Sequence, residues 1–308
     1  MSAPAFPAAV EPARIAVVVL NYRNAAHTMA CLRSIPAADV AQVLVWDNSV
    51  GGGSSTAELA APIAALRPDS PPIELVVSPV NLGFAAGVNA AIRHLRAGDN
   101  YSHYLLLNND AVLPANAIPS LLRTLSSAPG VVAAAPLLLT HGRTAGLRYH
   151  HRWLALQVSR PWQGTFAYAS GCCLLIDAAR MPDPLFDPAF FMYGEDVALA
   201  WKLRGMGLDI AIDDGVVIDH AGSGSSVLGS PFYEYHMARS HSLLTRQLAT
   251  GSLAAKLMIP ALRFCALLLR ACARAVRGRS MLPVSQTLLA LRGWRDIQPP
   301  APRNESHD

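Results

Sequence analysis

The stretch Tyr104-Leu105-Leu106-Leu107-Asn108-Asn109-Asp110 joins a short apolar run directly to two amides and a carboxylate. An apolar run of this length predicts a strand that is buried on both faces. The polar triplet then falls at the carboxyl end of the strand, which is the edge where open α/β sheets bind ligands. A carboxylate flanked by amides at this edge suits a divalent cation and a phosphate-bearing ligand. The alternative is an ordinary turn, because Asn and Asp are common turn residues.

Three predicted strands upstream also lead into Asn or Asp. The strands and the polar residues that follow them are Arg14–Leu20 with Asn21, Val43–Trp46 with Asp47, and Ile73–Val77 with Asn81. The helical patterns that separate the strands are Ala25–Ile35, Thr56–Leu66 and Ala85–Leu95. This alternation predicts an α/β fold with a Rossmann-like, mostly parallel central sheet wrapped by helices. Right-handed crossovers place the strand ends on one edge, so we expect the four polar ends to converge there.

Composition and missing motifs argue against several other classes of protein. The first strand is followed by Asn21-Tyr22-Arg23-Asn24, which lacks the G-x-G-x-x-G of a dinucleotide-binding domain, and no Walker loop is present. The five cysteines form no C-x-x-C pair, which disfavours a zinc site or disulfide framework and favours a reducing cytosol. We expect no signal peptide and no spanning helix, because no stretch approaches the roughly 20 apolar residues that a span requires. The net charge is a modest +4, and its basic excess is concentrated between Lys256 and Arg295. This local asymmetry favours an anionic surface, such as lipid head groups, over nucleic acid as a partner.

A second candidate site lies at Phe190-Phe191-Met192-Tyr193-Gly194-Glu195-Asp196, just before the predicted helix Val197–Met206. Carboxylates are favoured in a first helical turn by the helix dipole, which is a purely structural explanation. The functional alternative is that one carboxylate is a general base, since a base must stay ionised near neutral pH. The next predicted strand, Asp209–Ile218, leads into Asp219-His220, and a histidine at a strand end can be a metal ligand or an ordinary polar residue.

The region between the two candidate sites is less regular. Pro114–Leu125 has a helical pattern and Val131–Ala135 an extended one, whereas His141–Gln163 shows no clear period and is expected to be a long connection. The apolar run Phe166–Ile176 predicts extended structure, and Ser170-Gly171 within it suggests close approach of a ligand or backbone.

The C-terminal region is basic. Tyr233–Leu248 predicts a helix, and the segment after it holds four cations that recur every seventh residue, on one stripe of a helix. The four are Lys256, Arg263, Arg270 and Arg277, and Arg274 joins the stripe. The stripe is either the solvated face of a packed helix or the face of an interfacial helix on anionic lipid. We therefore expect a flexible tail (1–13), an α/β domain (14–250), a basic amphipathic helical extension (251–298) and a disordered tail (299–308).

Together these pieces resemble the inverting family 2 glycosyltransferases of the GT-A fold, especially the bacterial rhamnosyltransferase-like branch. The matching motifs, in the family's order, are Val18-Val19-Leu20-Asn21-Tyr22, Val45-Trp46-Asp47-Asn48-Ser49, Asn81-Leu82-Gly83-Phe84-Ala85-Ala86-Gly87-Val88-Asn89, Leu105-Leu106-Leu107-Asn108-Asn109-Asp110, Ser170-Gly171, Phe191-Met192-Tyr193-Gly194-Glu195-Asp196-Val197 and Ile218-Asp219-His220. They cover about residues 14 to 226. Each motif is weak alone, but the ordered set is specific.

The resemblance implies roles for residues in these motifs. The donor site would be lined by Asn21, Tyr22, Asp47, Asn81, Gly83, Phe84, Asn89, Asn108 and Asn109. Asp110 and His220 would hold Mg²⁺ or Mn²⁺ on the donor diphosphate, Asp196 beside Glu195 would be the base, and Arg239 would face the donor. The triplet has amides where stricter family members have an acidic first residue. We therefore expect Asp110 to hold a metal only together with His220 and the donor phosphates.

The resemblance also implies a reaction. An inverting glycosyltransferase moves a sugar from a nucleotide-diphosphate donor to a hydroxyl in one displacement. This branch indicates L-rhamnose from dTDP-rhamnose, a glycan or lipid-linked acceptor, and a role in cell-surface polysaccharide synthesis. The expected location is the cytoplasm, peripheral on the inner face of the cytoplasmic membrane.

Two alternatives remain open at this point. A sugar-phosphate nucleotidyltransferase would want a Gly-rich loop after the first strand, where this chain has Asn21-Tyr22-Arg23. A non-catalytic sugar-nucleotide-binding protein would not need both Asp110 and Asp196, so their presence argues against it.

Overall fold

The structure is a computed structural model that describes residues 13–49, 54–66, 70–140, 142–220 and 229–293. The predicted tail 1–13, apart from its last residue, and the predicted tail 299–308 lie outside the described residues.

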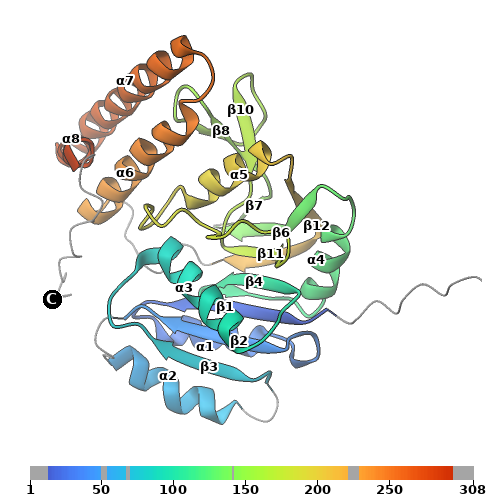
Figure 1. Cartoon of the computed structure of the whole chain (residues 1–308). Coiled ribbons are helices and arrows are strands. Elements are labelled where there is room, and N and C mark those ends of the chain that lie inside the picture. The colour runs from blue at the N-terminus through green and yellow to red at the C-terminus, as the bar shows by residue number, and fades with distance from the viewer. Residues whose placement is uncertain (1–12, 50–53, 67–69, 141, 221–228, 294–308) are drawn as a thin grey trace, which may run out of the picture.

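A nine-stranded sheet forms the centre of the molecule (Figure 1). Its strands are β1 (Ile15–Asn21), β2 (Gln42–Asp47), β3 (Ile73–Val77), β4 (His103–Asn108), β5 (Ala111–Val112), β6 (Val131–Thr140), β7 (Arg143–Ala145), β11 (Cys173–Asp177) and β12 (Asp209–His220). The spatial order is β3-β2-β1-β4-β11-β6-β12-β5, with β7 paired to β6. Neighbours from β3 to β4 are parallel, as are β6 and β12, whereas β11, β5 and β7 run antiparallel to their neighbours. The predicted α/β fold with its mostly parallel central sheet is confirmed.

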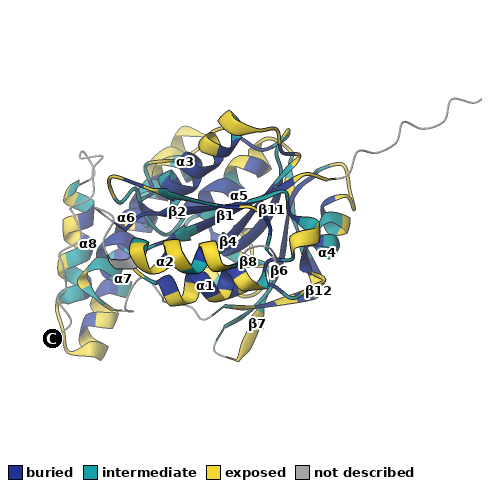
Figure 2. Ribbon diagram, turned by 90° about the horizontal axis from the view of Figure 1, so that it is seen from below, coloured by how far each residue is buried: buried dark blue, intermediate teal, exposed yellow. Residues whose placement is uncertain are grey.

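Helices cover both faces of the sheet, whose strands are buried between them (Figure 2). One core contains residues of α1 (Ala25–Ser34), α2 (Ser54–Ala65) and α4 (Ala117–Leu125), and the other contains residues of α3 (Gly83–Gly98) and α5 (Glu195–Gly205). A short 3₁₀ helix, η1 (Ala37–Asp39), precedes β2. In β4, Leu105 and Leu107 belong to the first core and Leu106 to the second, because successive side chains of a strand point to opposite faces. The expectation that this strand is buried on both faces is confirmed.

A second, three-stranded sheet lies beside the first. It consists of β8 (Arg148–His151), β9 (Gln157–Val158) and β10 (Thr165–Tyr168) in the order β10-β8-β9. The prediction of a long irregular connection over 141–163 was therefore wrong, because that segment contains β7, β8 and β9. The strands are short and pair antiparallel with one another or at a sheet edge, so they show no extended apolar run. The apolar run predicted over 166–176 is also divided, since β10 and β11 belong to different sheets.

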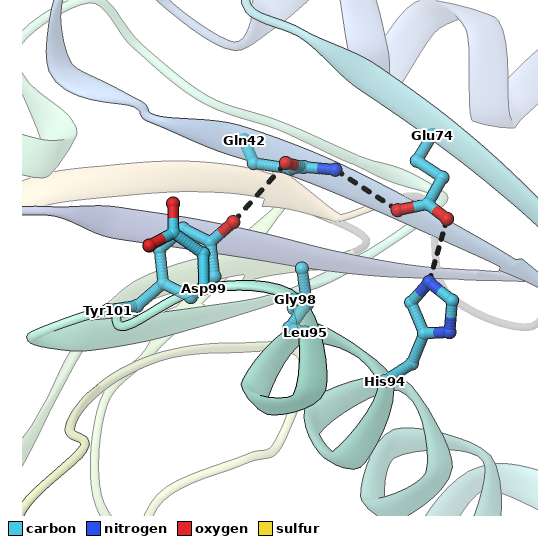
Figure 3. Close-up of a pocket in the computed structure, with 7 residues that line it drawn as sticks. All are labelled: Gln42, Glu74, His94, Leu95, Gly98, Asp99 and Tyr101. Carbon is cyan, nitrogen blue, oxygen red and sulfur yellow. Dashed lines mark hydrogen bonds and ion pairs between the residues drawn. The ribbon is translucent and has the colours of Figure 1, made fainter.

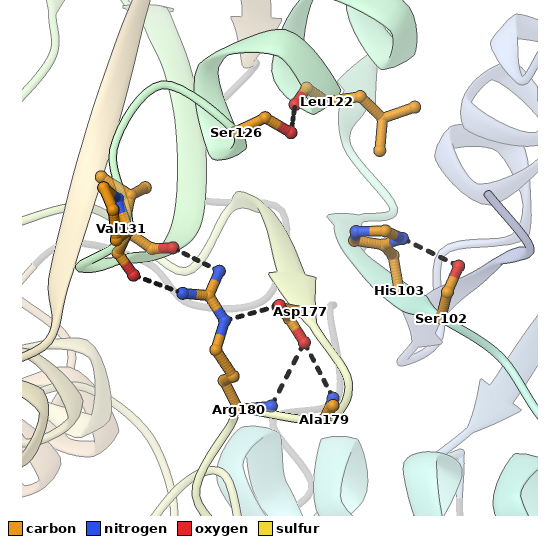
Figure 4. Close-up of polar contacts among 9 residues, drawn as sticks. Ser102, His103, Leu122, Ser126, Val131, Asp177, Ala179 and Arg180 are labelled. Atoms are coloured by element: carbon orange, nitrogen blue, oxygen red, sulfur yellow. Dashed lines mark hydrogen bonds and ion pairs between the residues drawn. The ribbon is translucent and has the colours of Figure 1, made fainter. Parts of the chain in front are cut away.

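Arg180 fixes the position of β11 against β6 at the edge of the sheet where β4 begins (Figure 4). Its Nη1 and Nη2 donate to the backbone carbonyls of Pro129 and Val131, both at 2.6 Å. Its Nε donates to the Asp177 carboxylate at 2.7 Å. The opposite end of β11, at Cys173, consequently lies beside the carboxyl end of β4.

Three helices follow the sheet and lie together to one side of it (Figure 1). They are α6 (Pro231–Leu248), α7 (Leu253–Gly278) and α8 (Leu282–Arg292). The side chain of Ser230 caps α6 and that of Ser252 caps α7, each by accepting a hydrogen bond from a backbone N–H. Among the described residues, no helix is long and apolar enough to cross a membrane.

The predicted basic stripe of α7 is mostly not a free face. Arg263 is fully buried. Its Nε donates to the Thr245 hydroxyl at 2.8 Å, and its Nη1 donates to the Arg152 carbonyl at 3.0 Å. Arg270 donates to the Leu154 carbonyl at 3.0 Å. The expectation of a solvated or lipid-facing stripe was wrong for these arginines, because α6 and the small sheet supply acceptors beneath them.

The remaining stripe cations lie nearer to solvent. Arg274 donates to the Glu234 carboxylate of α6 at 2.8 Å. Lys256 and Arg277, at the two ends of the stripe, are exposed. Three of the stripe cations, Arg263, Arg270 and Arg274, are therefore bonded to the protein, on the side of α7 that also buries Ile259 and Leu267.

Candidate active site

The polar ends of the parallel strands converge at one edge, as predicted. Asn21 pairs in register with Asp47, and Leu20 pairs with Asn108. Asn81 follows β3 in a turn that its own side chain stabilises, since its Oδ1 accepts a hydrogen bond from the backbone N–H two residues later at 2.9 Å. The edge therefore carries amides and carboxylates from four consecutive strands.

Asn21 and Asp47 form a buried network beneath this edge. The Asn21 amide donates to the Asp47 carboxylate at 2.9 Å and accepts a hydrogen bond from the Thr28 hydroxyl at 2.8 Å. The same carboxylate accepts hydrogen bonds from the backbone N–H of Ser49, at 2.9 Å, and from the Thr56 hydroxyl at the start of α2. Asn21 and Asp47, both predicted to line the site of the sugar donor, are fully buried. In this structure they tie strand ends to helices, and their contact with a donor stays a prediction.

Three other residues predicted to line the sugar-donor site lie nearer to the surface. Asn108, Asn109 and Tyr22 are each half-buried. The Asn109 amide donates to the Thr28 hydroxyl at 3.0 Å, which connects it to the buried network. The guanidinium of Arg23 lies over the Tyr22 ring at 5.2 Å. These side chains are placed where a ligand at the edge could reach them.

Asp110 and His220, the predicted metal ligands, are in contact. His220 lies opposite Ala111 because β12 pairs with β5, and its Nε2 is 3.3 Å from Oδ1 of Asp110. Burial acts to raise the pKa of Asp110, but the hydrogen bond and charge of His220 outweigh it, so the pKa lies below its usual value. Among the described residues no third His, Cys, Asp or Glu joins the pair. A carboxylate and an imidazole suit Mn²⁺ or Mg²⁺ only if other oxygens complete the coordination.

Gly83 lies where the motif that begins at Asn81 meets the motif that contains Phe191. Its φ is +73°, and a Cβ at this position would lie 2.3 Å from the carbonyl oxygen of Phe191. The next residue, Phe84, donates its backbone N–H to that carbonyl at 2.7 Å. The Asn48 amide donates to the Gly83 carbonyl at 2.9 Å. Only glycine satisfies both the backbone angle and the close approach.

Asn89, which the resemblance places at the donor site, is hydrogen-bonded to the backbone of Phe186. Its amide nitrogen donates to the carbonyl of Phe186 at 2.8 Å, and its oxygen accepts the backbone N–H of the same residue at 3.1 Å. The Phe186 ring lies 5.7 Å from the ring of Phe84. Asn89 itself is buried, so its role in this structure is to hold the loop that precedes α5.

The candidate catalytic carboxylates begin α5. Gly194, with φ +84°, allows the chain to enter the helix, and Asp196 accepts a hydrogen bond from the backbone N–H of Val197 at 2.8 Å. Burial raises the pKa of Asp196 to about 6, although backbone hydrogen bonds and the charge of Arg148 act against it. Burial raises the pKa of Glu195 further, and the Asp196 charge adds to this. Backbone hydrogen bonds and Arg148 favour the ionised form of Asp196, whereas one carboxylate oxygen of Glu195 has no hydrogen-bond partner among the described residues, so Asp196 is the better-supported base.

One short segment, 170–172, lies between the predicted metal ligands, Asp110 and His220, and the candidate base, Asp196. The backbone N–H of Asn108 donates to the carbonyl of Cys172 at 2.7 Å. The backbone of Gly171 is hydrogen-bonded to the Asp196 carboxylate, and this bond favours its ionised form. A Cβ on Gly171 would contact the Phe84 ring at 3.4 Å. The strand end that leads to Asp110 and the start of α5 therefore lie on two sides of this segment.

Several residues that shape the site carry no assigned role in the sequence prediction. Asn48 and Ser49 belong to one of the motifs of the family resemblance, and Thr28 lies in the first turn of the helix after β1, so the sequence pointed to their positions. Arg148 gave no such signal, because it lies in the segment predicted to be irregular. Arg239 did have a predicted role, facing the donor, and that role stays a prediction. It is buried and donates to the carbonyl of Gly293 at 3.3 Å, near the end of α8.

A separate pocket lies at the opposite edge of the sheet (Figure 3). Its lining includes Gln42, at the first residue of β2, and Glu74, near the start of β3. The Gln42 amide donates to the Glu74 carboxylate at 3.1 Å, and His94 contacts the same carboxylate at 2.7 Å. These side chains satisfy one another at the amino ends of the strands, away from the candidate site.

Similar solved structures share the fold. A mannosyltransferase of Pyrobaculum calidifontis, PcManGT, in complex with GDP-Man and Mn²⁺, has a TM-score of 0.55 at 17% identity, covering 96% of this chain and 92% of that chain. GalNAc-T7 with UDP, GalNAc and Mn²⁺ has a TM-score of 0.56 at 13% identity, covering 80% and 53%. Residues 1–349 of S. aureus TarS give 0.50 at 13% identity, covering 92% of each chain.

No curated protein matches the chain. A family model described as glycosyltransferase like family 2 matches residues 12–248, which contain the whole central sheet and every candidate site residue. The fold, the ordered motifs and this match agree with one another. The chain belongs to glycosyltransferase-like family 2, and it is a glycosyltransferase of the GT-A fold.

Proposed function

We propose that the enzyme transfers a sugar from a nucleotide-diphosphate donor to an acceptor hydroxyl with inversion of the anomeric carbon. One observation carries this proposal. The Asp110–His220 pair and the Asp196 carboxylate lie at the same sheet edge, linked through the segment 170–172. A leaving-group site and a base on two sides of one short segment suit a single displacement between them.

Asp110 and His220 would hold Mg²⁺ or Mn²⁺ at the donor diphosphate. The ion would neutralise charge on the leaving group. The pair fits this role because its two side chains touch while Asp110 stays 7% and His220 18% exposed, so phosphate oxygens can complete the coordination. Two structural neighbours are described with Mn²⁺ and a nucleotide or nucleotide sugar, which supports a divalent ion here.

Asp196 is proposed to accept the proton of the acceptor hydroxyl as that oxygen attacks the sugar. Its backbone hydrogen bonds hold the carboxylate in place and favour the ionised form. Burial and the charge of Asp196 both raise the pKa of Glu195, which disfavours a second charge beside the ionised base. A single displacement needs no second nucleophile, so no covalent sugar–enzyme intermediate is expected.

The donor is proposed to be dTDP-rhamnose, on the likeness of the motifs to the rhamnosyltransferase-like branch. The acceptor is proposed to be a glycan or lipid-linked sugar of cell-surface polysaccharide synthesis, at the inner face of the cytoplasmic membrane. Because one structural neighbour is described with GDP-Man and another with UDP, binding of dTDP-rhamnose has to be compared with binding of GDP and UDP sugars.

The test is a panel of dTDP-rhamnose, UDP-glucose and GDP-mannose, each with and without Mn²⁺. Thermal shift measures binding, and release of nucleoside diphosphate measures turnover. We expect dTDP-rhamnose to give the largest shift, and only with metal. A larger shift with another donor would replace the sugar assignment but keep the reaction class. Binding without any turnover would support a sugar-nucleotide-binding protein instead, and pyrophosphate release from a nucleoside triphosphate would support a nucleotidyltransferase.

A further inference from the structure

The side of α7 that faces away from the protein is apolar along the helix. At 3.6 residues per turn, its exposed residues cover about half of the circumference. We call this surface the outer face of α7. It consists of Leu257, Met258, Ala261, Leu262, Phe264, Cys265, Leu269, Cys272, Ala273 and Val276. Leu269 is 71% and Val276 80% exposed, so these side chains are not covered by the neighbouring helices.

A helix on the surface of a water-soluble domain buries its apolar face and exposes a polar one. α7 instead exposes an apolar face, and its buried side holds Arg263 together with Ile259 and Leu267. The charged stripe lies inward, where Arg263, Arg270 and Arg274 bind acceptors on α6 and in the loop after β8. Turning the helix over would expose the arginines and bury the leucines, but the acceptors in the protein body would lose their donors. The fold holds the apolar face outward by these hydrogen bonds.

Cations flank the outer face, and acids are missing. From Tyr235 to Arg295 the sequence contains no Asp or Glu. Lys256 lies near the start of α7, and Arg277 and Arg279 near its end, and all three are exposed. An apolar strip between exposed cations, without any carboxylate, is complementary to a surface that is apolar within and anionic at its boundary.

A second copy of the chain fits this surface less well. Helices that pair in water use a narrow apolar seam flanked by charged residues that set register. The outer face of α7 is about twice as wide as such a seam, and none of its residues is charged. Arg274 is also exposed but lies outside this face, where it donates to Glu234 of α6. A wide apolar face without charged residues is suited to lipid acyl chains, which can surround half of the helix.

We propose that the outer face of α7 lies in the boundary between the headgroups and acyl chains of an anionic bilayer, with the helix parallel to the membrane plane. The contact is apolar, with cations at the helix ends, and it does not use the inward arginine stripe. Met281, Leu288 and Leu289 of α8 add exposed apolar side chains to the same helical unit. This inference concerns attachment alone and holds for any sugar donor.

The chain carries two native probes for this contact. Cys265 and Cys272 lie on the outer face, and the other three cysteines are buried. The full chain is treated with a thiol-reactive maleimide in buffer, with vesicles of phosphatidylcholine, and with vesicles of equal parts phosphatidylcholine and phosphatidylglycerol. We expect fast labelling of both thiols in buffer and protection by the anionic vesicles. Labelling that stays fast with anionic vesicles would overturn the proposal, as would protection in buffer that disappears on dilution, because a second copy would then cover the face.

Co-sedimentation with the same vesicles tests the side chains. Leu257→Gln with Leu269→Gln should reduce partitioning into the pellet by at least about tenfold per leucine, because each exchange removes a buried leucine from the acyl boundary. The matched control is Trp162→Gln with Met206→Gln, which replaces apolar side chains that are 55% and 52% exposed elsewhere. The control should sediment like the wild type. Equal sedimentation of all three proteins, or none by the wild type, would overturn the proposal. A melting curve of each variant verifies that it is folded. If a variant is misfolded, the labelling of the wild-type protein still tests the proposal.

Discussion

The carboxyl edge of the sheet and helix α7 both remove charged side chains from bulk water, but they differ in how far those charges are partnered. In α7, each of the three guanidinium nitrogens of Arg263 donates a hydrogen bond. Arg263 binds fixed acceptors on α6 and in the loop after β8. At the sheet edge, Asp110 contacts His220 at 3.3 Å, and one oxygen of Glu195 has no hydrogen-bond partner among the described residues. Completed partners stabilise a fold, whereas incomplete ones leave room for a ligand or a proton. Changes at the edge should therefore alter catalysis, and changes under α7 should alter stability.

The largest expected effect is on turnover. Asp196→Asn should lower kcat by roughly 10²–10⁴-fold, because it removes the proton acceptor while keeping the shape of the side chain. Glu195→Gln is the matched control and should cost less than about tenfold, since Glu195 already holds its proton near neutral pH. Steady-state release of nucleoside diphosphate measures both. A larger loss in Glu195→Gln than in Asp196→Asn would reverse the assignment of the base.

The next effect is on stability and should leave the chemistry intact. Arg263→Ala should lower the free energy of unfolding by about 3 kcal/mol. The exchange leaves the buried Thr245 hydroxyl and Arg152 carbonyl without the hydrogen bonds that Arg263 donates. Arg277→Ala lies on the same stripe but is exposed, so its cost should stay within about 0.5 kcal/mol. Urea unfolding measures the difference. Equal costs would mean that the buried stripe does not hold α7 in place.

A smaller effect on stability and donor binding is expected at Gly83, where its motif meets the carbonyl of Phe191. Gly83→Ala should cost about 2 kcal/mol and weaken donor binding, because the added methyl would collide with the Phe191 carbonyl at a positive φ. Gly98→Ala, at the other end of α3, has open space around the new methyl and should be neutral or slightly stabilising. Thermal melting and donor titration of the pair check this. A Gly83→Ala protein that melts and binds like the wild type would show that the loop adapts freely.

The smallest effect is on pH dependence. The pKa of Asp196 is raised to about 6, so the base is protonated below that pH and kcat/KM should fall with acidification from there. An aspartate with an ordinary pKa would keep activity down to about pH 4. The raised values also mean that the folded state binds protons more tightly than the unfolded state. The stability from these acids is thus full below about pH 4 and is lost as the pH rises through the raised pKa values. Melting temperatures and rates at several pH values test both signs.

The convergence at the sheet edge could be predicted from the sequence because parallel strands leave little choice. Once Asn21, Asp47 and Asp110 follow buried strands of one sheet, their ends must meet. The contact of Asp110 with His220 was expected only from the family resemblance, because it depends on the pairing of β12 with the two-residue strand β5. Sequence periodicity does not reveal so short a strand.

The orientation of α7 and the inward direction of Asp47 could not be predicted. A seven-residue spacing shows that Arg263 and Arg270 share a stripe, but it does not show whether that stripe meets water or carbonyl oxygens. The acceptors belong to residues 152 and 154, in a segment whose short strands gave no pattern. Likewise, Asp47 turns inward because Thr56 and the backbone of Ser49 offer donors there, which only the packing decides.

The central claim is that donor binding and proton removal belong to two different groups at one edge. Calorimetric titration of the donor, with and without Mn²⁺, tests it directly in Asp110→Asn and Asp196→Asn. We predict that Asp110→Asn loses the Mn²⁺-dependent part of donor affinity, at least about tenfold, because a carboxylate ligand is removed. Asp196→Asn should bind donor and metal like the wild type while failing to turn it over. Unchanged Mn²⁺-dependent affinity in Asp110→Asn, or an equal loss in both variants, would contradict the account.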